Sequence, residues 1–460
     1  MNRGILRLGI ALLVIGIILF FRLGSEDAQA PASAGFDVAE IDEATMTLHR
    51  EALVWDAHND LAYRVLYEGL DIGDRLPAGH VDLPRMEEGG VDVQTVALFV
   101  QNFLYGQPGQ APRQARLLLN AMLEAIEANS DRVELARTGA DVERIVAAGK
   151  LAMPLAIEGG HAIESSLELL REFHGLGVSS MTLTHNVSHD WADSSADEPR
   201  WGGLNDLGRE VVREMNRLGM VVDISHVSDS TFFDVLEVTE DPVILSHSGV
   251  RGINPHRRNI SDDMLRALAE NGGVVAIVFV LNYLSPEYDE AMNALRAISR
   301  PWFQQVPMAE DPDLRSALDH LNQSRDWPMD NLPTLDDLLD HIDHAVQVAG
   351  ADHVGLGADM YPRTPSPLGI RGVEDYPNIT RGLKARGYSD EDVRKIMGGN
   401  LLRVWMEVTG EGSNRVARPG VPSTRVSRNA GRVRRIQSKV RCRSESSARP
   451  GSEAMGSQKG

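Results

Sequence analysis

Eight short apolar runs, which alternate with amphipathic segments between about residues 45 and 410, constrain the fold of this chain more than any other feature. The runs cover residues 53–57, 93–100, 153–157, 179–184, 221–225, 243–246, 274–280 and 353–357. Parallel strands need long crossover connections, usually helical, so this alternation predicts a parallel sheet. Eight repeats predict that the sheet closes into a (β/α)8 barrel of the TIM type.

The segments between the runs have helical periodicity, and several end in glycine, as helix C-termini often do. Examples are residues 113–129, 165–177, 206–219, 262–273 and 334–350. The alternative fold is a doubly wound open sheet, but no glycine-rich phosphate loop follows the first run. Residues 282–333 contain no clear strand and are rich in Pro, Asp and Trp, which predicts a substrate-shaping insertion after the seventh strand.

Polar residues follow six of the eight predicted strands. A single histidine or aspartate at a strand end is most often an ordinary loop residue, but coincidence across six strands is not expected by chance. In a barrel all of these side chains converge on the C-terminal face of the strands, where active sites lie. The set consists of His58, Asp60, Glu158, His185, His226, His247 and Asp359.

This mixture of imidazoles and carboxylates predicts a metal centre. Burying so many ionisable groups is costly unless cations neutralise them, and the donor set suits Zn²⁺ best. A site for two metals needs a bridging ligand. None of the lysines follows a strand, so the bridge should be a carboxylate, and Glu158 is placed to serve. The five lysines are Lys150, Lys384, Lys395, Lys439 and Lys459.

The remaining histidines are expected to have lesser roles. His341 and His344 share a predicted helix with four aspartates, which indicates a solvated helix face. His161, His189 and His256 are expected to support the site or to lie on the surface. His80 begins a loop and is expected to order it.

Composition and the chain ends bound the remaining functions. A formal net charge of -20 argues against nucleic acid as a partner, and the single cysteine, Cys442, excludes an internal disulfide and a zinc site built on cysteines. Arg3 and Arg7 precede an apolar run, so residues 1–35 are predicted to be an export signal or an N-terminal membrane anchor. Residues 36–412 then form the catalytic barrel of an exported protein, and residues 413–460 a basic, disordered tail.

The motifs together resemble the membrane dipeptidase family, also called renal dipeptidases, from about Ile41 to Val408. They are DAHNDL, GHVDLPRMEEGGV, AIEGGHAI, LTHN, ISHVS, ILSHSGV, RRNISDDML and GGNLLRV. The resemblance implies a (β/α)8 barrel that cleaves dipeptides with two zinc ions. One ion would be held by His58 and Asp60, and the other by His226 and His247, with Glu158 bridging them.

The resemblance also implies roles for three further residues. His185 would contact the substrate near the scissile peptide, Arg258 would receive the substrate carboxylate, and Asp359 would manage protons. Family members usually continue after this aspartate with Phe-Asp-Gly, whereas this chain has Met360-Tyr361-Pro362, which puts substrate preference in question. Two alternatives stay open: a metal-dependent amidase or lactonase acting on another small acyl substrate, and a non-catalytic exported binding protein. The expected partner is a small dipeptide, and membrane attachment through residues 1–35 and a homodimer are left open.

Overall fold

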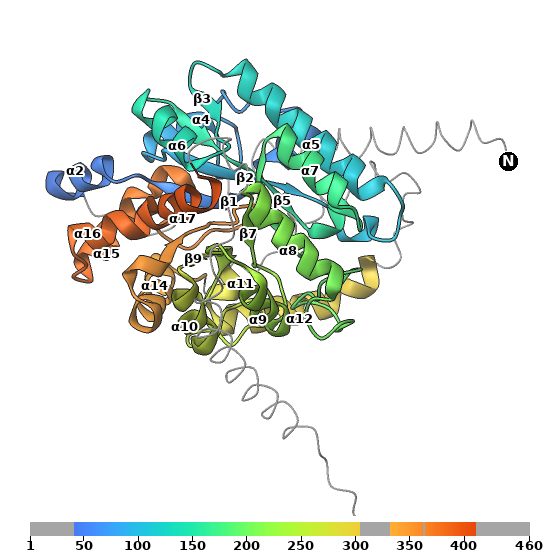
Figure 1. Cartoon of the computed structure of the whole chain (residues 1–460). Helices are drawn as coiled ribbons and strands as arrows, with labels where there is room; N and C mark the ends of the chain where they lie inside the picture. Colours follow the sequence, from blue (N-terminus) through green and yellow to red (C-terminus); the bar gives the residue numbers. More distant parts are fainter. Residues whose placement is uncertain (1–40, 304–331, 362–363, 411–460) are drawn as a thin grey trace, which may run out of the picture.

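The computed structural model describes residues 41–303, 332–361 and 364–410, and its centre is a closed parallel barrel surrounded by helices (Figure 1). β1 pairs with β2 on one side and with β10 on the other, which closes the sheet. Each of the eight predicted runs overlaps a barrel strand, so the predicted (β/α)8 fold is confirmed. The strands are β1 (Trp55–Asn59), β2 (Val93–Phe99), β5 (Leu155–Glu158), β6 (Val178–Thr182), β7 (Val221–Asp223), β8 (Ile244–Ser248), β9 (Val274–Ile277) and β10 (Val354–Leu356).

Helices cover the outside of the barrel, and their ends carry the expected signals. Ser166, Ser228 and Ser261 are N-caps that accept a hydrogen bond from the first turn of the helix, whereas Gly177 and Gly219 end their helices in the left-handed conformation. The main helices are α2 (Glu43–Glu51), α5 (Gln110–Ala128), α6 (Gly139–Ala147), α7 (Leu167–Leu176), α8 (Asp206–Leu218), α9 (Asp229–Val238), α10 (Asp262–Asn271), α14 (Leu335–Ala349), α15 (Pro377–Ala385), α16 (Asp390–Arg394) and α17 (Asn400–Thr409). Shorter helices are α3 (Leu61–Tyr63) and α4 (Leu83–Glu88).

The sheet also extends beyond the barrel. β4 (Leu151–Met153) pairs with β2, and β3 (Val133–Leu135) pairs with β4, so these two strands continue the sheet outward. The single run predicted at 153–157 is divided at Pro154, which lies between β4 and β5 and has no N–H to donate to a neighbouring strand. The carbonyl of Pro154 still accepts from Val96 N at 2.9 Å, so β2 contacts both halves of the run.

An apolar plug closes the N-terminal end of the barrel. α17 lies across this end, and the Trp405 ring packs 4.9 Å from the Trp55 ring, measured between centroids. Both indoles are fully buried. The plug contains Trp55, Ala57, Val93, Val221, Ile244, Val274, Ala276, Leu401, Val404 and Trp405, among others. The first residues of several barrel strands are therefore held together by hydrophobic burial.

The predicted insertion after the seventh strand begins with two helices. α11 (Leu281–Leu284) follows β9 closely, and α12 (Pro286–Phe303) continues from it. Leu281, Tyr288 and Met292 form a small apolar cluster at this point. The part of the insertion at residues 304–331 lies outside the described residues.

The prediction of a solvated face for His341 is wrong. His341 is fully buried on α14, where its Nδ1 accepts from Val250 N at 2.9 Å and its Nε2 lies 3.0 Å from the carbonyl oxygen of Leu284. His344 Nε2 lies 2.7 Å from Asp262 Oδ1. The aspartates do face outward, and Arg386 pairs with three of them, so the solvated face exists but does not include His341.

Within the described part of the chain, no helix combines the length and the apolar character that a membrane span requires. The predicted export signal or anchor at residues 1–35 and the predicted tail at 413–460 both lie outside the described residues.

Candidate active site

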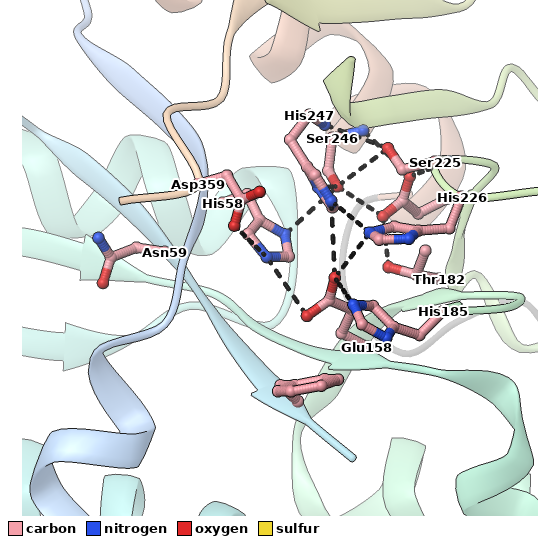
Figure 2. A network of polar contacts seen from close by, with 12 residues as sticks. His58, Asn59, Glu158, Thr182, His185, Ser225, His226, Ser246, His247 and Asp359 are labelled. Atoms are coloured by element: carbon pink, nitrogen blue, oxygen red, sulfur yellow. Dashed lines mark hydrogen bonds and ion pairs between the residues drawn. The ribbon is translucent and has the colours of Figure 1, made fainter. Parts of the chain in front are cut away.

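The C-terminal ends of the strands bring the predicted polar residues together around Glu158. Figure 2 shows all of them except Asp60. Glu158 Oε1 lies 3.1 Å from His226 Nε2 and 3.5 Å from His247 Nε2. The other oxygen, Oε2, lies 3.6 Å from His58 Nε2. One carboxylate therefore faces His58 with one oxygen and the pair His226 and His247 with the other.

Three groups of residues have donor atoms close enough to share a cation. Their ligand atoms lie within 4.8 Å of one another. The groups overlap, because Glu158, His58 and His247 each belong to two of them. They are His58, Asp60 and Glu158; Glu158, His226 and His247; and His58, His247 and Asp359. The first two are the sets expected for a pair of bridged metal ions.

Several atoms of this cluster lack the hydrogen bonds that buried polar groups normally make. His58 Nε2 and Asp60 Oδ1 are buried and have no hydrogen-bond partner among the residues that the structure describes. His226 Nε2 and His247 Nε2 lie only 2.9 Å apart, both directed toward Glu158. Two imidazole lone pairs at that separation repel unless a proton or a cation lies between them. The residues thus fit divalent metal ions.

The burial and close spacing of these ionisable groups also shift their pKa values. Burial and the nearby charges of Glu158 and Asp359 raise the pKa of Asp60 well above its usual value. Burial would lower the pKa of His58, but Glu158, Asp359 and Asp60 raise it to about 10. Without metal, the raised pKa values of His58 and Asp60 mean that bound protons supply positive charge to the cluster. A bound cation would supply the same charge.

Two further histidines behave in the opposite way. Burial, together with the charge of Arg258 and of neighbouring histidines, lowers the pKa of both His226 and His247 well below the usual value. Both imidazoles are therefore neutral at pH 7 and have a lone pair available, as a metal ligand requires.

His185 lies beside the cluster, and its ring packs against Phe99 with 4.4 Å between centroids and 52° between the ring planes. Its Nε2 is 3.8 Å from Glu158 Oε1. The side-chain amide of Asn102 approaches its Nδ1, with the nitrogen at 2.9 Å and the oxygen at 3.1 Å. Burial lowers the pKa of His185 to about 4, so the ring is neutral near pH 7.

Asp359 faces the cluster from the end of β10. Its Oδ1 lies 3.8 Å from His58 Nε2. Burial raises its pKa, His58 opposes the shift and Glu158 adds to it, and the result is a pKa of about 7. Its backbone has φ 53°, and that of His226 has φ 67°. Residues other than glycine rarely adopt this left-handed conformation, and it occurs here at two site residues.

The loop that replaces the expected Phe-Asp-Gly remains packed at the site. Met360 and Tyr361 are both buried. Met360 pairs with Asn59 as an isolated bridge, and Tyr361 lies 6.4 Å from Tyr63 between ring centroids. Pro362 lies outside the described residues.

Arg258 is buried on the loop that follows β8, and its Nη2 donates to the carbonyl oxygen of His247 at 3.2 Å. Its guanidinium lies 5.4 Å from the centre of the Tyr283 ring, which belongs to α11. The Nε atom has no hydrogen-bond partner among the described residues. The loop thus returns Arg258 to the mouth of β8, as its predicted role requires.

The other histidines occupy supporting positions. His161 and His189 are buried, and their Nε2 atoms approach the carbonyl oxygens of Gln101 at 3.3 Å and Leu183 at 2.8 Å. His256 Nε2 lies 3.9 Å from Asp289 Oδ1. The two ring nitrogens of His80 each lie 2.6 Å from a carbonyl oxygen, one of Arg371 and one of Thr364, so His80 connects two loops as predicted.

Sequence reasoning missed the polar residues that support the cluster. Asp56 Oδ1 accepts from His58 N at 3.2 Å and from Ala358 N at 2.9 Å, so it joins the ends of β1 and β10. Asn186 Oδ1 lies 3.2 Å from His226 Nδ1. Asp223 lies beneath the cluster. Each of these polar residues is within three positions of a predicted site residue along the chain, a signal that could have identified them.

Comparisons with known proteins agree with this geometry. A family model described as membrane dipeptidase (peptidase family M19) matches residues 42–417. Dipeptidase tcpJ of Claviceps purpurea (strain 20.1) is 33% identical over 366 residues, which cover 77% of this chain and 76% of that protein. Uncharacterized dipeptidase C965.12 of Schizosaccharomyces pombe (strain 972 / ATCC 24843) is 32% identical, with 77% of this chain and 80% of that protein covered.

A solved structure has a similar overall fold. The crystal structure of the probable dipeptidase PvdM from Pseudomonas aeruginosa has a TM-score of 0.68 and 27% identity to this chain, and it covers 80% of this chain and 98% of its own. A (β/α)8 barrel that gathers imidazoles and carboxylates at the C-terminal ends of its strands is typical of metal-dependent hydrolases. The chain belongs to the membrane dipeptidase family, peptidase family M19, and is a metallopeptidase.

Proposed function

We propose that this protein is a binuclear zinc dipeptidase whose substrates carry a free C-terminal carboxylate. The observation that carries the proposal is the position of Glu158, whose two oxygens face separate groups of ligands. His58 and Asp60 would hold one ion, His226 and His247 the other. When bound, two zinc ions supply a Lewis acid for the scissile carbonyl and lower the pKa of water toward neutrality.

His185 is suited to stabilise the oxyanion that develops on the carbonyl oxygen. The nitrogen of the Asn102 amide is its nearer contact, and if that nitrogen donates to Nδ1, the hydrogen of the neutral ring is on Nε2. A neutral imidazole with that hydrogen can donate a hydrogen bond to the oxyanion.

Asp359 is suited to move the proton. A carboxyl with a pKa of about 7 can accept a proton from water and return it to the leaving amine near neutral pH. Its closeness to His58 places it beside one of the proposed metal positions.

Arg258 would hold the carboxylate of the substrate. The planar guanidinium matches a carboxylate in geometry, and its burial strengthens such a pair. An enclosed site with a fixed anchor of this kind restricts the length of the substrate.

The test combines metal analysis with a substrate panel on the same purified, zinc-loaded sample. The panel contains dipeptides, dipeptide amides, N-acyl amino acids and lactones. We expect about two zinc ions per chain and rapid hydrolysis of free dipeptides alone. Equal or faster turnover of amides or lactones would favour the amidase or lactonase. That alternative is kept because the altered Met360-Tyr361-Pro362 loop puts substrate preference in question. No turnover of any substrate would favour a binding protein.

We also propose that the barrel is exported, on the basis of the basic and apolar N-terminal sequence. A reporter fused after Gly410 should be active outside the cytoplasm. Activity restricted to the cytoplasm would refute export.

A further inference from the structure

A buried aspartate beneath the site accepts four hydrogen bonds from three strand ends. Asp223 Oδ1 accepts from Ser225 N at 2.9 Å and from Ser246 N at 3.0 Å. Its Oδ2 accepts from Thr182 Oγ1 at 2.5 Å and from Ser246 Oγ at 2.6 Å. All four groups are buried, so Asp223 joins the ends of β6, β7 and β8.

Ser246 connects this aspartate to the proposed metal ligands. Its Oγ lies 2.8 Å from His247 Nδ1 and 3.4 Å from His58 Nδ1. A hydroxyl has one hydrogen and two lone pairs. Because the hydrogen is donated to Asp223, the oxygen can only accept from its other neighbours, which are the two imidazoles and Ser225 Oγ at 3.4 Å. His247 Nδ1 is the nearest of these three. His247 must then carry its hydrogen on Nδ1, and His58 can do the same.

The consequence for the metal site follows from the two-sided nature of imidazole. A ring that carries its hydrogen on Nδ1 has its lone pair on Nε2, and Nε2 is the atom that faces Glu158 in both residues. Metal-binding histidines commonly donate their other N–H to a carboxylate or carbonyl, which fixes the tautomer. Here the carboxylate acts through an intervening hydroxyl that serves both histidines.

We propose that Asp223 and Ser246 form a relay that fixes the tautomers of His247 and His58, and that both are positioning residues for both metal ions. The inference rests on the proposed function only in requiring that divalent metal binds at this cluster. Neither residue would touch the substrate. The relay has a direction, since hydrogen bonds run from imidazole to hydroxyl to carboxylate.

That direction can be reversed by one substitution. In Asp223→Asn, the remaining oxygen can still accept from the two backbone N–H groups, whereas the new NH₂ group replaces the oxygen that faced the two hydroxyls. Ser246 Oγ would then accept from the amide and donate to His247 Nδ1, which places the imidazole hydrogen on Nε2 and blocks ligation. In Ser246→Ala the relay is absent and the tautomer is unconstrained.

The experiment measures zinc affinity of the full chain, metal-depleted and then titrated in competition with a chromophoric chelator. We expect Ser246→Ala to weaken binding of at least one ion by about ten- to a hundredfold, the range for lost supporting contacts of metal ligands. Asp223→Asn should weaken it further. The double variant Asp223→Asn, Ser246→Ala should return to the level of Ser246→Ala, because the amide has lost its connection to His247.

Two controls separate this role from general damage to the barrel. Ser179→Ala removes another buried hydroxyl of β6, one that donates only to the carbonyl oxygen of Leu155. Thr182→Val removes the second hydroxyl donor to Asp223 without reversing the relay. Both should keep wild-type zinc affinity. If Asp223→Asn does not fold, the comparison of Ser246→Ala with these two controls still tests the relay. Thermal unfolding of each metal-free variant reports damage independently of zinc.

The outcomes are distinct. The relay is refuted if Ser246→Ala binds zinc as tightly as Ser179→Ala, or if the losses in the double variant simply add. A wild-type chain that binds no zinc overturns the proposed function, and the relay with it. A wild-type chain that binds two ions while Ser246→Ala is unchanged overturns the relay alone.

Discussion

The two ends of the barrel are built from the same strands, yet they follow opposite physical rules. At the N-terminal end, apolar side chains from five barrel strands and α17 pack into a buried hydrophobic cluster. At the C-terminal end, the strands terminate in imidazoles and carboxylates, some of which lack hydrogen-bond partners among the described residues. β1 shows both within five residues, since Trp55 belongs to the plug and His58 to the metal cluster.

The N-terminal end of the barrel therefore supplies stability, and the C-terminal end supplies the chemistry. The plug removes apolar surface from water and stabilises the fold. The site concentrates charge and includes two residues in the left-handed conformation, which cost free energy in the absence of ligand. Substitutions at the plug should therefore change stability, and substitutions at the site should change metal binding and catalysis.

Glu158→Gln should have the largest effect. The substitution keeps the size of the side chain but removes the charge that both ions would share. We expect loss of at least one metal ion and a fall in kcat/KM beyond the ~10²–10³ caused by removing a single group that stabilises a transition state. Zinc content and dipeptide turnover are the measurements. Glu134→Gln, on β3 outside the barrel, is the matched control, and a Glu158→Gln variant with two ions and normal turnover would refute the bridge.

Trp405→Ala should have the next largest effect, on the stability of the apolar plug at the N-terminal end. Truncation of a fully buried indole leaves a cavity in the plug and should lower the free energy of unfolding by about 3–5 kcal/mol. Urea denaturation of the metal-free protein measures it. Trp201→Ala removes an indole that is 46% exposed at the active-site end, and it should cost much less. Equal losses of unfolding free energy at the two positions would contradict the role of the plug in stabilising the fold.

Arg258→Met should lower kcat/KM for dipeptides by roughly ten- to a hundredfold, mainly through KM, since a charge-assisted hydrogen bond contributes about 1.5–3 kcal/mol. Amidation of the dipeptide removes the same pair from the other side, so the two losses should not add. Arg251→Met is the control, because Arg251 lies on the same loop but pairs with Asp229. Full additivity of the two losses would show that Arg258 does not hold the carboxylate.

His341→Ala should have the smallest effect of the four, but a larger one than the solvated position predicted from the sequence would give. The variant leaves Val250 N and the carbonyl of Leu284 unsatisfied, which costs about 1–3 kcal/mol of stability. Burial lowers the pKa of His341 from 6.5 to about 4, so its contribution is present above pH 6.5 and declines as the pH falls toward 4. Urea denaturation should therefore show a larger penalty at pH 8 than at pH 5, with His344→Ala as the control. An equal penalty at both values would contradict this account.

The sequence predicted the barrel and the members of the cluster because both leave local signals. An apolar run followed by a polar residue identifies a strand end, and the barrel topology then brings His58, Glu158 and His247 together. The break at Pro154 was missed because the two halves form one apolar run. His341 was misjudged because its partners, Val250 and Leu284, are remote in sequence and neither is suggested by helical periodicity. The relay through Asp223 and Ser246 depends on side-chain contacts between neighbouring strands, which no single segment reveals.

The closure between β1 and β10 has a consequence for how the protein folds. The hydrogen bond from Ala358 N to Asp56 Oδ1 joins residues 302 positions apart, and His58 and Asp359 lie just beyond this seam. Contacts between such remote segments form slowly, because a long loop must be ordered before they stabilise the chain. The cluster is incomplete until the seam forms, so zinc uptake during refolding should report the moment at which the barrel closes.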